Sequence, residues 1–235
     1  MRDHLVRGIV EPQGLRVVLV RSADLSRMAR MLHGAYPSSA ILFAQGLTAG
    51  LLLGALQKDK ARINLQIECD GPAKGMLIDA DADGNVRGTI RQPLVHFPGD
   101  PVLGARAAIG RAGFLSVLRD LGEGNFYRGS VELRALDVAH DLERYFDESE
   151  QVASAVELAV VPRGEEPLGE VAGILVQKLP DGDIEALAQV RSRLRSGKLA
   201  ELVATSASAQ EIITTLVGER FELLADLEIA YTCTC

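Results

Sequence analysis

The sequence predicts an α+β protein, with a strand-rich antiparallel sheet core and packed helices, followed by a helical linker region. Two observations favour strands in the first part: apolar and polar residues alternate strictly in 62–68, and Gly-containing turns follow. A third concerns the later part, because residues 183–217 carry apolar residues at helical spacing. We therefore expect a core domain over 1–180, a helical linker region over 181–230 and a short terminal segment over 231–235.

The N-terminal part predicts two strands and then two helices. Between Gly8 and Val20, a Pro- and Gly-containing turn separates two strands, the second being Leu15–Arg21. Ser22 or Asp24 can cap a helix over 25–33. After a Tyr-Pro break, a long apolar helix runs over 38–56, and its small residues allow close packing against neighbours.

The middle of the chain predicts an antiparallel meander. The strand over 62–68 ends at a turn in which we expect Asp70 to bond its own backbone and Gly71 to take a positive φ. Strands over 75–80 and 86–91 follow, joined by a second Gly-containing turn.

The rest of the predicted core contains four more strands and one helix. Strands over 114–119 and 126–133 form a pair, and Asp137 caps a helix with apolar residues at i, i+4, i+7 and i+8. Strands over 155–161 and 171–179 follow. Beyond them, glycines separate the helices of 183–217, and an extended segment over 221–229 leads to the terminal cysteines.

Composition excludes several classes of protein. The 235 residues are 47% hydrophobic and 24% charged, which is ordinary for a globular protein, and the net charge is −7. An acidic surface repels phosphate backbones, so we expect no nucleic acid partner. The basic residues Arg191, Arg193, Arg195 and Lys198 are interpreted as a solvated helix face rather than a binding patch.

The sequence shows no pattern typical of a secretion signal or a membrane span. The N-terminus begins with charged residues, and the apolar run over 40–56 is shorter than the roughly 18 residues of a membrane span. Three cysteines are too few for a secreted disulfide scaffold. We therefore expect a cytoplasmic protein with no membrane partner.

The residues that usually carry catalysis form no recognisable motif. The histidines, His4, His33, His96 and His140, are scattered, and each is interpreted as a surface or packing residue. Nucleotide-binding loops and nucleophile elbows are missing, so the sequence predicts a protein that is not an enzyme. Cys69, at the end of an alternating strand, is interpreted as a small apolar side chain.

The Cys-x-Cys end of the chain carries the clearest chemistry. Residues two apart in an extended segment point to the same side, so Cys233 and Cys235 can face one metal ion or each other. As thiolates they would supply two of the usual four ligands of a zinc site. As an oxidised pair they would span about 6.6 Å between Cα atoms, near the limit for a disulfide, which suits an easily reduced switch.

Several segments in order are similar to the heat-shock protein 33 family, the redox-regulated holdase chaperones of the bacterial cytosol. The resemblance covers essentially the whole chain and ends with the terminal Cys-x-Cys. Its segments are Asp70-Gly71-Pro72, Val86-Arg87-Gly88, Tyr127-Arg128-Gly129, the Tyr-Phe-Asp-Glu-Ser-Glu-Gln run over 145–151 and the Ala-Gly-Ile-Leu-Val-Gln-Lys-Leu-Pro run over 172–180.

This resemblance implies a function and a mechanism. In the family, a Cys-x-Cys and a later Cys-x-x-Cys bind one zinc ion in the reduced, inactive state, which assigns metal and redox roles to Cys233 and Cys235. Oxidation to disulfides releases zinc and loosens the zinc domain and the linker. The exposed apolar surface then binds unfolding client proteins without ATP, and family members form homodimers. We expect clients to bind at the linker helices and the adjoining sheet surface.

The sequence departs from the family pattern at its end. The chain stops at Cys235, before the family's Cys-x-x-Cys, so 231–235 is interpreted as the stub of a zinc-binding redox-switch domain. Zinc coordination is then incomplete within one copy, and we expect activity to depend less on oxidant. Ala172 stands where a second glycine is expected, and Cys69 has no counterpart in the switch.

Two other functions stay open from the residues themselves. The first is a thiol–disulfide oxidoreductase that uses Cys233 and Cys235 as its dithiol, although the helix-start Cys-x-x-Cys of thioredoxin-like enzymes is missing. The second is a zinc-linked structural assembly protein in which cysteine pairs of two chains share a metal ion.

Overall fold

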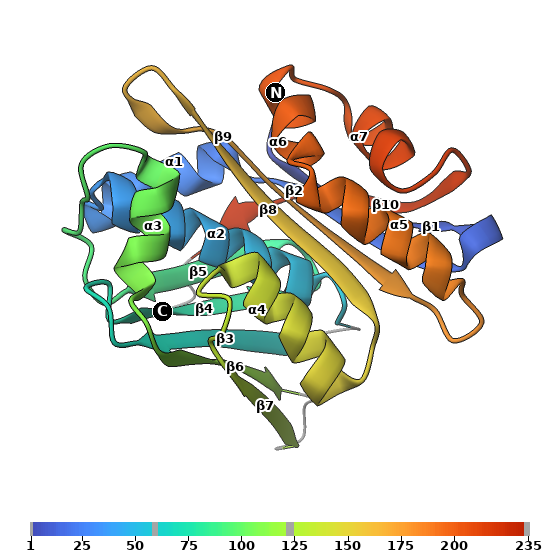
Figure 1. Cartoon of the computed structure of the whole chain (residues 1–235), viewed down its shortest axis with the longest axis horizontal. Coiled ribbons are helices and arrows are strands. Elements are labelled where there is room, and N and C mark those ends of the chain that lie inside the picture. Colours follow the sequence, from blue (N-terminus) through green and yellow to red (C-terminus); the bar gives the residue numbers. More distant parts are fainter. Residues whose placement is uncertain (1, 58–60, 121–124, 233–235) are drawn as a thin grey trace.

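Two β-sheets enclose a long helix in the computed structural model, which describes residues 2–57, 61–120 and 125–232 (Figure 1). The five-stranded sheet has the order β10-β1-β2-β9-β8, and the six-stranded sheet has the order β11-β5-β4-β3-β6-β7. Neighbouring strands run antiparallel except β11, which is parallel to β5. The predicted α+β class is confirmed.

The elements have the following bounds. The strands are β1 His4–Val10, β2 Leu15–Arg21, β3 Arg62–Cys69, β4 Gly75–Asp81, β5 Asn85–Ile90, β6 Gly113–Asp120, β7 Phe126–Glu132, β8 Ser154–Arg163, β9 Glu166–Lys178, β10 Phe221–Glu228 and β11 Ala230–Tyr231. The helices are α1 Ala23–His33, α2 Pro37–Gly54, α3 Pro101–Ile109, α4 Val138–Tyr145, α5 Ile184–Arg195, α6 Lys198–Ala204 and α7 Ala209–Leu216. Short 3-10 and π turns occupy Glu11–Gln13 and Phe146–Glu150.

Helix α2 forms the centre of the core, between β4 of one sheet and β9 of the other. Every residue from Ser38 to Gly54 is buried. The small residues predicted to allow close packing do so: a Cβ on Gly50 would lie 2.6 Å from Cγ2 of Ile78 in β4. This helix is long and apolar enough for a membrane span, but 89% of that window is buried inside the protein.

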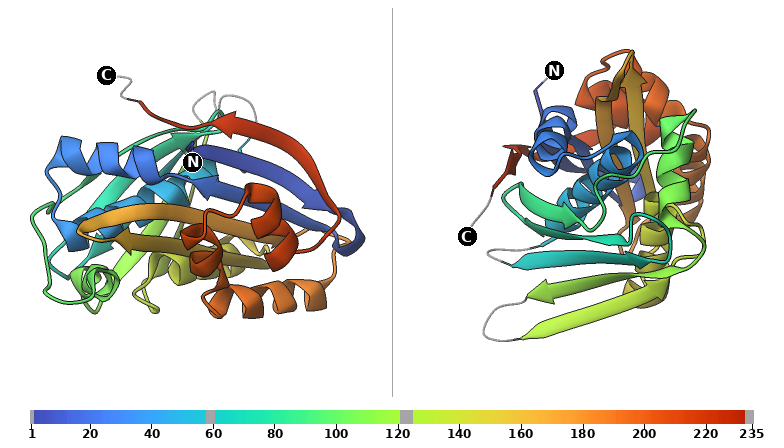
Figure 2. Two further views of the ribbon diagram at one scale, coloured as in Figure 1. Left: turned by 90° about the horizontal axis from the view of Figure 1, so that it is seen from above. Right: turned by 90° about the vertical axis from the view of Figure 1, so that its left-hand side faces the viewer.

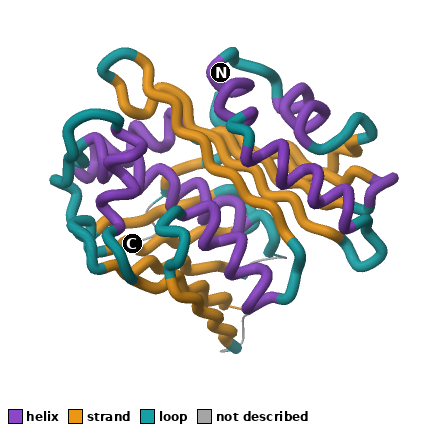
Figure 3. The backbone as a smooth tube through the Cα atoms, viewed as in Figure 1, coloured by secondary structure: helices purple, strands orange, loops and turns teal. Residues whose placement is uncertain are grey.

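Helices α5, α6 and α7 cover the opposite face of the five-stranded sheet (Figures 1 and 3). The sheet is therefore enclosed on both faces, by α2 on one and by these three helices on the other. The helices expected over 183–217 are confirmed, and the extended segment over 221–229 is β10, which pairs with β1. The division at residue 180 stays a prediction, although β10 returns to the same sheet as the core strands.

The predicted meander is confirmed as β3-β4-β5, but its first turn is built differently. The Asp70 carboxylate accepts hydrogen bonds from the backbone N–H groups of Arg111 (2.8 Å) and Ala112 (3.0 Å), which tie the turn to the start of β6. These bonds lower the pKa of Asp70. The positive φ values belong to Lys74 and Gly75, at 60° and 114°, and Gly71 does not take one.

The expected cap of α1 is also wrong. Ser22 occupies the N-cap position, but neither its side chain nor that of Asp24 makes a capping bond. The first N–H groups of the helix, those of Asp24 and Leu25, donate to the Asp3 carboxylate at 3.1 and 2.6 Å. The Ser22 hydroxyl bonds the Thr48 hydroxyl of α2 instead, at 2.8 Å. A cap supplied by tertiary contact has no local sequence signal.

Other differences concern element bounds. Helix α3, capped by Asp100 and starting at Pro101, lies in a stretch for which no element was expected. Strand β1 begins at His4 rather than near Gly8, because β2 and β10 pair with its whole length. Asp137 does cap α4, where its carboxylate accepts from the His140 N–H at 3.1 Å.

Candidate functional site

An apolar surface lies under α5, α6 and α7, and it is the candidate site that the fold produces. We call the sheet side of it the covered face; its buried residues are Val6, Val10, Leu15, Val17, Leu19, Ala155, Ala159, Ala172, Ile174 and Val176. The helices contribute Leu187, Val190, Leu194, Leu199, Val203, Ile212, Ile213 and Leu216. This second apolar cluster is separate from the main core around α2. One face of the five-stranded sheet packs against α2 in the main core, and the other face is apolar as well and is covered by α5, α6 and α7.

The covered face follows from the strand sequences. In β2 the run Val17 to Val20 is apolar at every position, so alternate side chains enter the main core and the second cluster. Strand β9 does the same, with Leu175 in the main core and Ile174 on the covered face. Continuous apolar runs of this kind are typical of strands that are buried on both faces.

Helix α5 is fastened to the rest of the core by charged contacts around Glu143 of α4. Arg191 Nε lies 2.9 Å from one Glu143 oxygen, and Arg195 lies 2.7 Å from the other. The same carboxylate accepts from the Val156 N–H of β8 at 3.0 Å. The Glu143 side chain is only 10% exposed, so this single acid joins α4, α5 and β8 away from bulk water.

Further contacts of the α5 arginines hold this helix against β8 and α7. Arg195 donates to the Val156 carbonyl (3.0 Å) and pairs with Glu157 (3.1 Å), and Arg193 donates to the Leu216 carbonyl (3.1 Å). Burial raises the pKa of Glu157, an effect that Arg195 opposes. The prediction of a solvated face is therefore wrong for Arg191, which pairs with the buried Glu143. It holds in part for Arg193 and Arg195, which are exposed although each donates to a backbone carbonyl of a neighbouring element. Lys198, which pairs with Glu201 of its own helix, fits it.

The predicted site residues Cys233 and Cys235 lie outside the described residues. The strand that leads to them is described and is attached to the six-stranded sheet: Ala230 N–H donates to Gly84 and Thr232 N–H to Val86, both at 3.0 Å. The Tyr231 hydroxyl donates to the Gly88 carbonyl at 2.9 Å. The cysteine pair therefore follows directly on a segment that is held by the core.

Cys69 is a free thiol that lies at the end of β3, half-buried, opposite Gly113 of β6. Burial raises its pKa, so little of it is thiolate, the reactive form, at neutral pH. Its interpretation as an apolar packing residue agrees with this position.

We expect the Cys69→Ala variant to keep the oxidant response of the parent protein, because a thiol with a raised pKa reacts slowly with peroxide. Mass spectrometry after brief peroxide treatment should find Cys69 mostly reduced. Rapid sulfenic acid formation at Cys69, or a lost oxidant response in the variant, would assign it a redox role.

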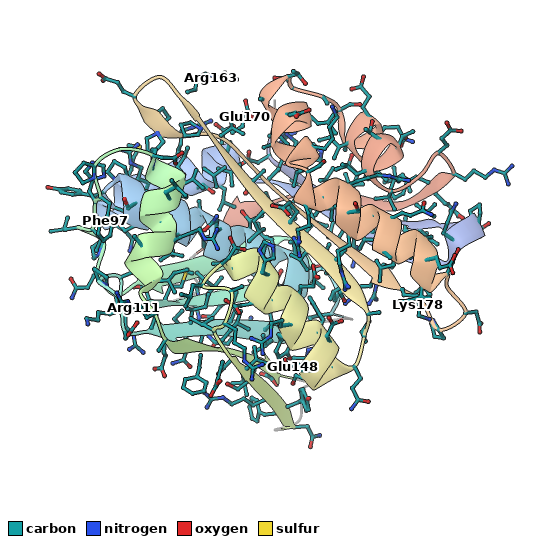
Figure 4. All side chains as sticks on the ribbon, viewed as in Figure 1. Phe97, Arg111, Glu148, Arg163, Glu170 and Lys178 are labelled. Atoms are coloured by element: carbon teal, nitrogen blue, oxygen red, sulfur yellow. The ribbon has the colours of Figure 1, made fainter. Side chains whose placement is uncertain are left out.

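His33, His140 and Glu148 occupy structural positions. His33 packs edge-on against Phe43 with 5.0 Å between ring centroids, and His140 bonds the capping acid Asp137. Glu148 pairs with Arg144 at 2.7 Å, beyond the end of α4 where Figure 4 labels it. Within the described residues, no group of three or more His, Cys, Asp or Glu side chains is placed to hold a metal ion.

The sequence did not identify Glu143 as a functional residue. The only local signal is its place on α4 between buried apolar neighbours, Leu142 and Tyr145, which puts a carboxylate beside the core. The spacing of Arg191 and Arg195, four residues apart, shows that both can reach one partner. Which partner they reach depends on tertiary packing.

Comparisons with known proteins identify the family of the chain. The family model described as Hsp33 protein matches residues 3–235. A "33 kDa chaperonin" of Geobacter sp. (strain M21) is 36% identical over 100% of this chain and 81% of its own length. That of Bacillus subtilis (strain 168) is 30% identical over 99% of this chain and 81% of its own.

A solved structure shows the same fold. The crystal structure of the 33 kDa chaperonin (Heat shock protein 33 homolog) from Thermotoga maritima aligns with a TM-score of 0.88 at 24% identity. The alignment covers 100% of this chain and 81% of that one. From the family match and these relatives, the chain belongs to the Hsp33 family.

Proposed function

We propose that this protein is a holdase chaperone that works without ATP and is controlled by thiol oxidation. The observation that supports this most is the covered face: a continuous apolar sheet surface, buried under three short helices that precede the cysteine pair in the chain. Once uncovered, such a surface would bind apolar segments of unfolding proteins through the hydrophobic effect.

The three helices are suited to release because they are short and separable. They contain 12, 7 and 8 residues, and isolated helices below about 12–15 residues are marginal in water. Their helical structure therefore depends on docking to the covered face and on the contacts of α5 with Glu143. Loss of either would undock and unfold them together.

Zinc fits the terminal cysteines by donor chemistry, although this sequence supplies only part of a site. Two thiolates two residues apart match half of a tetrahedral zinc centre, and further ligands have to come from beyond the described residues. When bound, zinc would stabilise the fold of a small module around it. In our proposal Cys233 and Cys235 are its ligands in the reduced protein and the thiols that peroxide oxidises to a disulfide, while peroxide is reduced to water.

The Cys233→Ser/Cys235→Ser variant should bind clearly less zinc per chain than the parent protein, since a hydroxyl does not replace a thiolate ligand. A chromogenic chelator added to the reduced, dialysed proteins measures this directly. The Cys69→Ala variant is the matched control and should keep its zinc. Equal zinc content in all three proteins would remove the metal role of the pair.

Client holding itself can be tested by light scattering of a heat-denaturing protein, without ATP, with this chain added reduced or peroxide-treated. Suppressed aggregation after oxidation alone would support a switch made by Cys233 and Cys235. Suppression under both conditions would support a holdase without redox control. No suppression would contradict the proposal, and turnover of a dithiol substrate would then favour an oxidoreductase.

The partners in this proposal are unfolded or oxidatively damaged proteins in the cytoplasm, and a second copy of the chain in a homodimer. Its function is binding rather than catalysis, so no enzyme activity is part of it. Sedimentation at micromolar concentration tests the dimer, and one zinc per dimer with no client binding would instead support a zinc-linked assembly protein.

A further inference from the structure

Residues 221–232 form an extended segment that lies along the edges of both sheets, and we call it the strap. Its first part, β10, pairs with β1 at the edge of the five-stranded sheet, from Phe221 opposite Val10 to Glu228 opposite His4. Its second part, β11, pairs with β5 at the edge of the six-stranded sheet. In Figure 2 the strap is the red ribbon beside the dark blue β1.

Side chains hold the strap mainly towards its later part, where Leu227, Ile229 and Tyr231 pack against the main core. The residues from Glu222 to Leu224 are all exposed, with Leu223 and Leu224 at 55% and 58%. Between Phe221 and Leu227, the strand β10 is therefore held mainly by backbone hydrogen bonds to β1. A strand bound in this way can be exchanged for another extended chain, because backbone pairing does not depend on sequence.

An aromatic residue anchors each end of the strap. At the start, the Phe221 ring lies over Gly8 of β1, so closely that a Cβ on Gly8 would lie 2.2 Å from a ring carbon and from the Glu222 carbonyl oxygen. Phe221 also packs against the second apolar cluster. Gly8, where the pairing register shifts, thus forms a seat for a large apolar side chain.

At the other end, Tyr231 is fixed by two hydrogen bonds. Its hydroxyl donates to the Gly88 carbonyl, and His33 Nε2 lies 2.9 Å from the same hydroxyl oxygen. His33 is held in turn against Phe43 of the core. This latch lies two residues before Cys233, so a change at the cysteine pair reaches Tyr231 before it reaches β10.

We propose that the strap occupies a strand-addition site for client proteins, and that the Tyr231 latch keeps this site closed. When the strap leaves, the edge of β1 presents unpaired N–H and C=O groups beside the covered face. The occupant is an extended segment of an unfolded protein, with a large apolar side chain in the seat at Gly8. This inference rests on the proposed holdase function and adds the mode of binding.

Three properties favour an extended client segment as the occupant. The site already holds an extended chain in antiparallel register along the seven residues of β1. The seat at Gly8 accepts an apolar ring, and unfolded proteins expose such side chains. The site also adjoins Val6 and Val10 of the covered face, so one client chain could engage both surfaces.

The test uses the full chain with Tyr231→Phe, which keeps the ring but removes both hydrogen bonds of the hydroxyl. The matched control is Tyr36→Phe, because the Tyr36 ring is 52% exposed and its hydroxyl makes no hydrogen bond among the described residues. We expect amide hydrogens of 221–231 to exchange up to about 30-fold faster in Tyr231→Phe, since two bonds of roughly 1 kcal/mol each are lost and every 1.4 kcal/mol is tenfold. Unchanged exchange would overturn the latch.

The probe for the open edge is a fluorescent peptide with the sequence of residues 220–232. It should bind reduced Tyr231→Phe up to about 30-fold more tightly than the parent or Tyr36→Phe, and it should compete with an unfolded client. A peptide with prolines in place of Leu224 and Ala225 should not bind, because one of two neighbouring N–H groups faces β1. Equal binding of both peptides, or no gain in Tyr231→Phe, would overturn the strand-addition site.

A second variant separates release of the strap from use of its seat. In Gly8→Ala the new Cβ clashes with the Glu222 carbonyl and the Phe221 ring, so the strap should loosen as in Tyr231→Phe. The same Cβ fills the seat, so we expect no gain in peptide binding. Tight peptide binding by Gly8→Ala would contradict the role of Gly8.

Two further outcomes are decisive. If Tyr231→Phe forms a dimer by exchanging straps and then excludes the peptide, the edge of β1 binds a second copy of the chain. The proposal that client segments bind this edge is then overturned. Peroxide-treated parent protein is assayed for client holding in parallel. If the oxidised parent protein suppresses aggregation but the peptide does not bind Tyr231→Phe, the strand-addition site is wrong and the proposed holdase function stands. If the oxidised parent protein does not suppress aggregation, the proposed holdase function is wrong, whether or not the peptide binds.

Discussion

The Glu143→Gln variant should suppress client aggregation without oxidant. Gln keeps the size of the side chain but removes the charge that Arg191 and Arg195 share. Arg195 then keeps Glu157 (3.1 Å) and Arg191 keeps the more distant Asp147 (3.8 Å). Breaking a fully buried pair costs about 3–5 kcal/mol. These arginines are 38% and 29% exposed, so we expect a smaller loss of α5 docking free energy, about 2 kcal/mol.

A loss of that size raises the population of undocked α5 roughly 30-fold. Light scattering of a denaturing client with the reduced variant measures the gain. Glu68→Gln is the matched control, because Glu68 forms an equally short ion pair with Arg91 but is 52% exposed and far from α5 in the sequence and the fold. A reduced Glu143→Gln protein that holds no more client than Glu68→Gln would show that these contacts do not restrain the helices.

Substitutions on the two sides of the covered face should have opposite effects on client holding. On the helix side, Leu194→Ala removes a side chain that is 1% exposed, and such truncations cost about 2–5 kcal/mol. The helices should undock while the sheet surface stays intact, so the reduced variant should hold clients. This gain is the result expected if α5, α6 and α7 cover the client surface as a lid.

On the sheet side, Val17→Thr/Ile174→Thr places hydroxyl groups on the covered face itself, at positions that are fully buried. The helices should loosen here too, because unpaired buried hydroxyls are costly. Client holding should nevertheless fall below that of Leu194→Ala, since the binding surface has become polar. Circular dichroism checks that both proteins fold, and equal holding by both variants would place the client surface elsewhere.

Much of the fold could be predicted from the sequence because its strands and helices carry local patterns. The alternation in 62–68 and the turn glycines predict the meander, and the helical spacing in 183–217 predicts α5 to α7. The missed features come from contacts between distant segments. Asp3 caps a helix twenty residues later, and the acid that pairs with the arginines of α5 lies about fifty residues before them.

The candidate site was predictable only in part for the same reason. The terminal cysteines are visible by their spacing, but they lie outside the described residues, and their metal and redox roles stay a prediction. The linker helices and the adjoining sheet surface were expected to bind clients, but the residues of the covered face could not be named in advance, because a strand such as β2 shows where apolar residues are and not what covers them. Glu143 and Tyr231 take their importance from partners that only the fold brings near.

The most direct test of this account is hydrogen–deuterium exchange of the whole chain, before and after peroxide treatment, with client holding measured on the same samples. We predict that amides of 184–216 lose their protection on oxidation, while those of β2 and β9 keep theirs and client holding appears. If the oxidised protein holds clients while the amides of 184–216 stay fully protected, the three helices are not the lid of the client surface.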